Sequence, residues 1–253
     1  MNGTVSRRVF VGSVAAGLPL VAGASSDSLP ELPTGGGHHH LTAGTTPDAM
    51  FEHTIRQLAP IANKARREGM TAADARIVAA HVGTLAVYVG QADLDTRMAI
   101  AMRDLVSAKN RGETPDLRID TATVRARLKP YGVDVDERAL AALRPDEKMR
   151  ARAIDDLYQY GLTGMLTRFA STCERTAAQL GRHAGPAAGI RLVQDDDWRA
   201  LLCPALWADV ERAAAEAAAA CATRIFIPQI DGVCAVAELV LEMLLAAYFA
   251  LCV

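Results

Sequence analysis

The chain has 253 residues, with 27 Lys and Arg against 29 Asp and Glu, so its formal net charge is -2. This near balance, with a pI of about 6.3, gives no general attraction to nucleic acid. Half of the chain (51%) is apolar but only 5% is aromatic, which excludes wholesale disorder and disfavours a sheet-rich fold. The 48 alanines and 26 leucines favour helix, and five cysteines are too few for a disulfide scaffold.

The first 24 residues resemble a twin-arginine export signal. Paired arginines, an aromatic residue two positions later, a moderately apolar stretch and a small-x-small cleavage pattern follow one another in the usual order. The residues that carry this resemblance are Arg7, Arg8, Phe10, Ala22 and Ala24. Val11 and Gly12 depart from the consensus, in which Leu and Lys are commoner. A general secretory signal, in which the arginines are only a positively charged start, is the alternative.

Both kinds of signal predict a mature protein that is periplasmic or secreted from a bacterial cytoplasm. The twin-arginine interpretation adds the twin-arginine translocase as a partner and export in a folded state, which is compatible with a cofactor but requires none.

Residues 25–46 are rich in Ser, Pro and Gly and predict a flexible linker. Three consecutive histidines, His38, His39 and His40, lie within it. Neutral imidazoles are good ligands for Zn, Cu or Ni, so these residues are candidate metal ligands. The alternative is a polar linker without a site, because the neighbouring glycines supply no rigid support.

The rest of the chain, 47–253, predicts one all-α domain, an irregular bundle of about seven to nine helices. A change in composition near 111–120 marks the candidate boundary between two parts of this domain. No alternating apolar and polar pattern of strand length occurs, and no internal repeat can be aligned.

Helix starts and stops are readable in the first part of the domain. Thr46 and Pro47 predict the start of a helix that Gly69 ends. Thr71 and Asp74 resemble a capping box and open a second helix. A wide apolar face makes this second helix a central one, formed by Ile77, Val78, Val82, Leu85 and Val89. A third helix is expected from Asp93 or Asp95 to about Asn110.

Shorter helices follow, capped by Asp120 and by Asp134 or Asp136. From Pro145 apolar residues recur every three or four positions as far as Leu180, which predicts an element roughly 50 Å long at 1.5 Å per residue. Gly161 and Gly164 predict a kink or a close helix crossing within it. Pro204 is expected to divide a short helix from an alanine-rich one over 205–227, which packs inside the bundle.

Val233–Val253 is 21 residues long and apolar except for Glu238 and Glu242. The length fits a membrane span, but each carboxylate near the bilayer centre costs about 2.5–3.5 kcal/mol. Together with Asp231 the two glutamates fall on one face of a helix. We therefore favour a core or oligomer-forming helix, with a membrane anchor as the alternative.

The cysteines lack Cys-x-x-Cys spacing, which disfavours thioredoxin-like, iron–sulfur and c-type haem sites. Buried thiols are the favoured interpretation and one or two disulfides the alternative, for Cys173, Cys203, Cys221, Cys234 and Cys252. No Glu-x-x-His, His-x-x-x-His, Gly-x-Ser-x-Gly or P-loop pattern occurs. His81 lies among apolar residues in the sequence, so we expect a hydrogen-bonded histidine of the core rather than a catalytic base. A site assembled from distant residues would need His53, His81, Asp93, Glu238 or Glu242 to converge.

The sequence thus predicts an exported helical protein that acts as a non-enzymatic binding, scaffold or assembly component. A metal- or cofactor-loaded redox protein and a membrane-associated subunit are the alternatives. Expected partners are a second copy or a partner helix contacting residues 205–253. Nucleic acid is not expected, and a membrane is not favoured.

Overall fold

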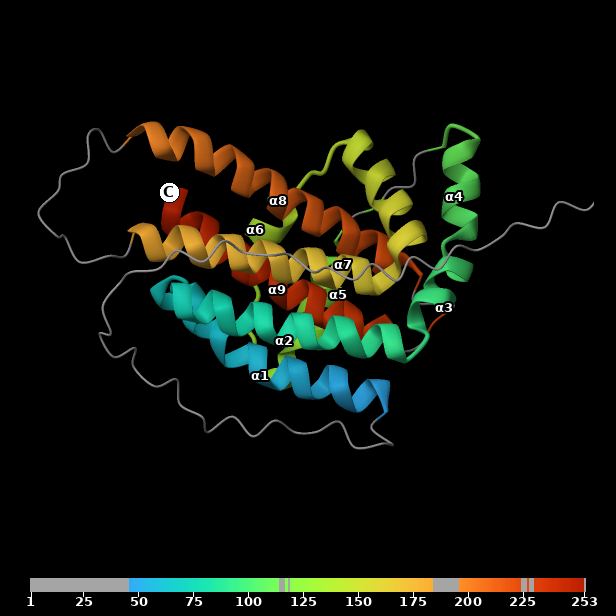
Figure 1. Cartoon of the computed structure of the whole chain (residues 1–253), viewed down its shortest axis with the longest axis horizontal. Helices are drawn as coiled ribbons and strands as arrows, with labels where there is room; N and C mark the ends of the chain where they lie inside the picture. Colours follow the sequence, from blue (N-terminus) through green and yellow to red (C-terminus); the bar gives the residue numbers. More distant parts are fainter. Residues whose placement is uncertain are drawn as a thin grey trace, which may run out of the picture. The chain divides into compact units, whose positions relative to one another are not determined.

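The structure is a computed structural model that describes residues 46–113, 117, 119–183, 196–223, 227 and 230–252. All regular secondary structure among these residues is helical, which confirms the predicted all-α fold (Figure 1). The described helices belong to one compact unit. The predicted signal, His38–His40 and all but the last residue of the predicted linker lie outside the described residues.

The first helix begins and ends where the sequence predicts, and the second begins where it predicts. The first is α1 (Pro47–Glu68), where the Thr46 hydroxyl accepts a hydrogen bond from the Ala49 N–H at 3.3 Å. Gly69 ends it with φ 82°, a left-handed value that glycine adopts without strain. Next is α2 (Ala72–Gln91), which opens with a complete capping box between Thr71 and Asp74. Ile77, which was assigned to the buried face of α2, is instead 45% exposed, so that prediction was wrong.

The middle of the domain is built from short helices. They are α3 (Leu94–Ala101), α4 (Arg103–Asn110), α5 (Thr121–Leu128), the 3-10 helix η1 (Lys129–Tyr131) and α6 (Glu137–Ala142). Asp120 and Asp136 cap α5 and α6 as predicted. The expected third helix is wrong in one respect, because it is divided at Met102 into α3 and α4. Met102 is fully buried at this break, so the apolar spacing continues across it and gives no sign of the interruption.

The predicted long element is α7 (Glu147–His183), and its backbone leaves the helical conformation at Gly161, with φ 64° and ψ -163°. This confirms the predicted kink. The start differs slightly, because Asp146 is the residue whose carboxylate accepts the Met149 N–H, at 2.6 Å. On the far side of the kink the Thr163 N–H donates to the Asp95 carboxylate at 3.0 Å, which joins α7 to α3.

Gly161→Ala is expected to destabilise the protein by about 3 kcal/mol, because this backbone conformation is accessible essentially to glycine alone. The added Cβ would also lie 2.7 Å from the Cβ of Asp95. Gly83→Ala in α2 is the matched control, since its Cβ would meet its nearest neighbour at 4.0 Å. We expect that control to be neutral or stabilising by up to about 1 kcal/mol. Urea unfolding measures both, and equal free energies for the two variants would contradict the assignment of the kink.

The last two helices are α8 (Asp196–Ala222) and α9 (Ile230–Cys252). The predicted division at Pro204 is wrong, because α8 continues through it. Pro204 and Ala200 are both exposed, so water can satisfy the Ala200 carbonyl that lacks an N–H partner.

The two C-terminal helices and α1, α2 and α7 pack on one another. Contacts join α2 with α7, α7 with α8, α8 with α9, and α9 with α1 (Figure 1). The side chains from Val233 to Leu245 are all buried, which confirms that this segment is a core helix of the chain. By length and hydropathy α2 and α9 would each suffice to cross a membrane, and 78% of the apolar window of α9 is buried inside the protein.

Candidate functional site

The helical core contains three buried glutamates on its last two helices. Glu216 of α8 is 1% exposed, and Glu238 and Glu242 of α9 are 6% and 8% exposed. Burial disfavours the charged form of each side chain and raises the pKa of all three to about 7. The sequence singled out Glu238 and Glu242 but not Glu216, whose signal was a lone acidic residue inside an alanine run.

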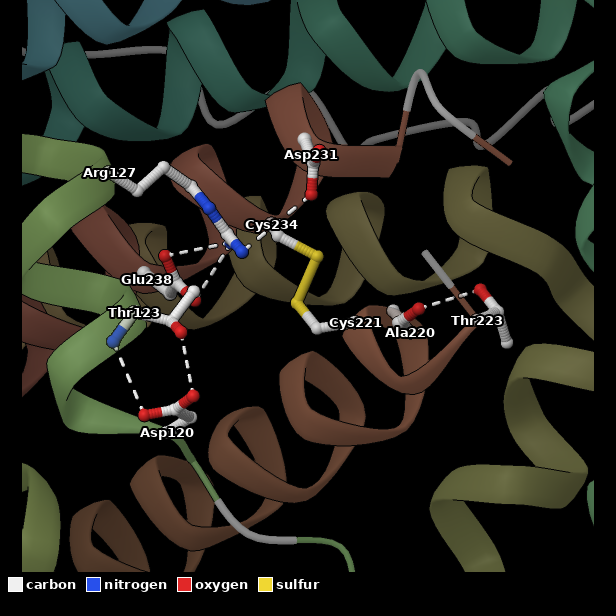
Figure 2. A network of polar contacts seen from close by, with 9 residues as sticks. All are labelled: Asp120, Thr123, Arg127, Ala220, Cys221, Thr223, Asp231, Cys234 and Glu238. Atoms are coloured by element: carbon white, nitrogen blue, oxygen red, sulfur yellow. Dashed lines mark hydrogen bonds and ion pairs between the residues drawn. A yellow bond between two sulfur atoms is a disulfide. The ribbon is translucent and has the colours of Figure 1, made fainter. Parts of the chain in front are cut away.

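Glu238 is paired with Arg127 of α5 (Figure 2). The Arg127 Nη1 donates to both carboxylate oxygens, at 3.0 and 3.1 Å, while its Nη2 lies 3.7 Å from Asp231. Asp120 accepts the Thr123 N–H at 3.2 Å and so fixes the start of the helix that carries Arg127. The acidic face expected on the C-terminal helix is therefore formed, and a cation from α5 partly neutralises it.

Two disulfides link α8 to α9. One joins Cys203 to Cys252 and the other joins Cys221 to Cys234, which lies beside the Arg127–Glu238 pair (Figure 2). The favoured interpretation of these four residues as thiols was wrong, and the alternative of two disulfides is the one that the structure contains. Spacing gave no sign of the pairing, because antiparallel packing of the two helices brings the partners together. Cys173 is a buried free thiol, and burial raises its pKa to about 12.

Glu216 is paired with Arg168 of α7, whose Nε donates to one carboxylate oxygen at 2.9 Å. The second oxygen of Glu216 and the Nη2 of Arg168 are buried without a hydrogen-bond partner in the described part of the chain. The guanidinium also lies 5.9 Å from the centre of the Tyr160 ring, which provides a cation–π contact. This pair holds α7 against α8 beyond the kink.

Glu242, one of the residues that the sequence named for a site assembled from distant positions, lines a pocket of about 250 Å³ between α1, α6 and α9. One oxygen of Glu242 accepts the Asp136 N–H at 3.1 Å, and the Asp136 carboxylate caps α6. Arg66, on the rim, is paired with Asp134 at 2.9 Å. Apolar residues complete the wall: Ala65, Ala139, Leu245, Ala246 and Phe249. The ionisable side chains of the described lining are thus Arg66, Asp136 and Glu242.

The other convergence candidates lie elsewhere. His81 of α2 is half-buried, and burial together with the charge of His53 lowers its pKa. Asp93 precedes α3 in a left-handed conformation, with φ 55°. No group of three or more His, Cys, Asp or Glu side chains arranged to hold a metal occurs within the described residues. The candidate ligands His38, His39 and His40 fall outside them.

The buried glutamates predict stability that falls as the pH rises. Their unfolded carboxyls ionise near the ordinary value of 4.5, whereas the folded ones hold their protons up to about 7. Between these values the folded state binds more protons, so the free energy of unfolding decreases with rising pH, by at most about 1.4 kcal/mol per pH unit for each group. Glu242→Gln keeps the acceptor for the Asp136 N–H and is expected to flatten this slope. Urea unfolding between pH 4.5 and 8 measures it, and an unchanged slope would contradict the prediction.

Comparison with models of known protein families, with curated proteins and with solved structures gives no match.

Proposed function

We propose that this chain is an exported helical protein that acts outside the cytoplasm by binding rather than by catalysis. The observation that carries the proposal is the pair of disulfides between α8 and α9. Disulfides persist in oxidising compartments and are rare in the reducing cytoplasm. They therefore support, independently of the N-terminus, the export that Arg7 and Arg8 predict.

Binding is favoured over catalysis by how the ionisable groups are used. Arg127 and Glu238 face each other, as do Arg168 and Glu216, so these pairs hold helices together. Glu242 lines a small pocket with an apolar wall, which is suited to holding a small molecule. The burial of α9 also favours a helix of the core over a membrane anchor, although Phe249 near its end is 44% exposed and is available to a partner.

The export half of the proposal is tested with a double Arg7→Lys, Arg8→Lys variant expressed in a bacterium that has both export pathways. The two lysines keep the positive charge that a general secretory signal needs but remove the paired arginines. We expect the unaltered protein in the periplasm or medium and the variant in the cytoplasm. Export of the variant would overturn the twin-arginine route, and cytoplasmic retention of the unaltered protein would overturn export altogether.

Thiol counting on the recovered protein tests the observation that carries the proposal. Alkylation in denaturant should modify one of the five cysteines before reduction and all five afterwards. Cys173→Ala is the matched control and should leave no reactive thiol before reduction. Five reactive thiols in unreduced exported protein would remove the support that the disulfides give.

A further inference from the structure

A second pocket, of about 290 Å³, is lined by other residues than the pocket at Glu242. It is formed by the segment leading into α5, the end of α6 with the turn after it, the first turns of α7, and α8. Its apolar residues are mostly buried: Leu117, Ile119, Leu140, Leu143, Ala214 and Ala218. This set gives the pocket an aliphatic floor.

Two arginines line the same pocket, Arg144 from the turn after α6 and Arg150 from α7. The Arg144 Nη1 donates to the Leu143 carbonyl at 2.9 Å. The Arg150 Nε is buried and has no acceptor within the part of the chain that the structure describes. Arg150 as a whole is half-buried, so part of its side chain remains accessible.

Among the described residues, the two arginines of this pocket differ in their charge partners from Arg127 and Arg168. Arg127 and Arg168 each have a glutamate as partner. Over the described residues neither Arg144 nor Arg150 forms an ion pair, and the lining contains no Asp or Glu. The described lining therefore combines two positive charges with an aliphatic floor, and a guanidinium suits a carboxylate in geometry as well as in charge.

We propose that this pocket binds a small organic carboxylate with a short apolar tail, with the carboxylate at Arg144 and Arg150 and the tail on the floor formed with Ala214 and Ala218. The volume lies just below the range of about 300–1,000 Å³ typical of pockets for drug-sized ligands, so the tail is short. A neutral hydrocarbon would offer no negative charge to the two guanidinium groups. An inorganic anion would leave the aliphatic floor in water.

Titration calorimetry on the purified, oxidised protein tests this with octanoate as the probe. Octan-1-ol has the same tail without the charge, and acetate has the carboxylate without the tail. We expect octanoate to bind at one site and each of the other two to bind at least tenfold more weakly. Octan-1-ol binding as tightly as octanoate, acetate binding as tightly, or no octanoate binding would each overturn the proposal.

Substitutions in the lining test whether octanoate binds in this pocket. Arg150→Gln and Arg144→Gln are each expected to weaken octanoate binding at least tenfold, and Ala218→Leu is expected to abolish it by filling the floor. Arg138→Gln is the matched control, because Arg138 is exposed on α6 and does not line the pocket. Since Arg144 is itself exposed, its replacement tests the site even if the other two variants fail to fold. Equal affinity in Arg144→Gln and Arg138→Gln would overturn the assignment. The measurement uses purified protein, so its outcome does not depend on the route of export.

Discussion

Replacing Arg127 with Ala is expected to destabilise the protein by about 3–5 kcal/mol, because removing one partner of a buried ion pair leaves the other charge without compensation. The Arg127 side chain is 14% exposed and that of Glu238 is 7% exposed, so water replaces little of what is lost. The loss should be larger at pH 8 than at pH 5. Burial already raises the pKa of Glu238 to about 7, and without the guanidinium the folded carboxyl takes up a proton more readily at low pH.

Two further variants separate this effect from simple loss of side-chain packing. The double variant Arg127→Ala, Glu238→Gln should recover part of the lost free energy, because no charge is then left buried. Arg152→Ala removes the exposed partner of Asp156, 3.9 Å away, and should cost no more than about 1 kcal/mol. Urea unfolding at both pH values measures all of them. A cost in Arg127→Ala that is equal at pH 5 and pH 8 and unrelieved by Glu238→Gln would count against a buried ion pair.

Removing either disulfide is expected to lower the free energy of unfolding by about as much as Arg127→Ala does. Cys203 and Cys252 are 49 residues apart, and a loop of that length corresponds to about 4 kcal/mol of lost chain entropy in the unfolded state. Cys221 and Cys234 are 13 residues apart, which corresponds to about 3 kcal/mol. Replacing Cys203 and Cys252 by Ser should therefore destabilise the protein more than replacing Cys221 and Cys234 by Ser, because the first disulfide closes the longer loop.

The matched control is the same measurement after full reduction. Both double variants and the unaltered protein should then unfold within about 1 kcal/mol of one another, because the difference between them is the cross-link. A difference that persists in the reduced proteins would assign the loss to packing at the replaced side chains. Unfolding free energies that are the same for the oxidised protein and for both oxidised double variants would show that neither bond constrains the chain.

Capping residues allowed the starts of several helices to be predicted from the sequence alone. Thr46 with Pro47, Thr71 with Asp74, Asp120 and Asp136 start helices where the sequence predicts, because a capping interaction joins residues only two or three positions apart. The kink at Gly161 is equally local, since only glycine tolerates that backbone. Errors arose where packing against other elements decides burial, as at Ile77, an apolar residue of α2 that is 45% exposed.

At the candidate sites, features along one helix were predictable from the sequence, whereas contacts between helices were not. The sequence placed Asp231, Glu238 and Glu242 on one helix face, because helical periodicity fixes directions along a single element. It could not place Arg127 opposite Glu238, 111 residues away, nor distinguish the thiols of Cys221 and Cys234 from a disulfide. Nor could it bring Arg144 and Arg150 together above Leu117 and Ala214. Composition and periodicity determined an all-α chain, and capping residues determined the starts of α1, α2, α5 and α6. Which charges, sulfurs and cavities meet was decided only by how those helices pack, because these contacts join positions whose separation in the chain carries no periodic signal.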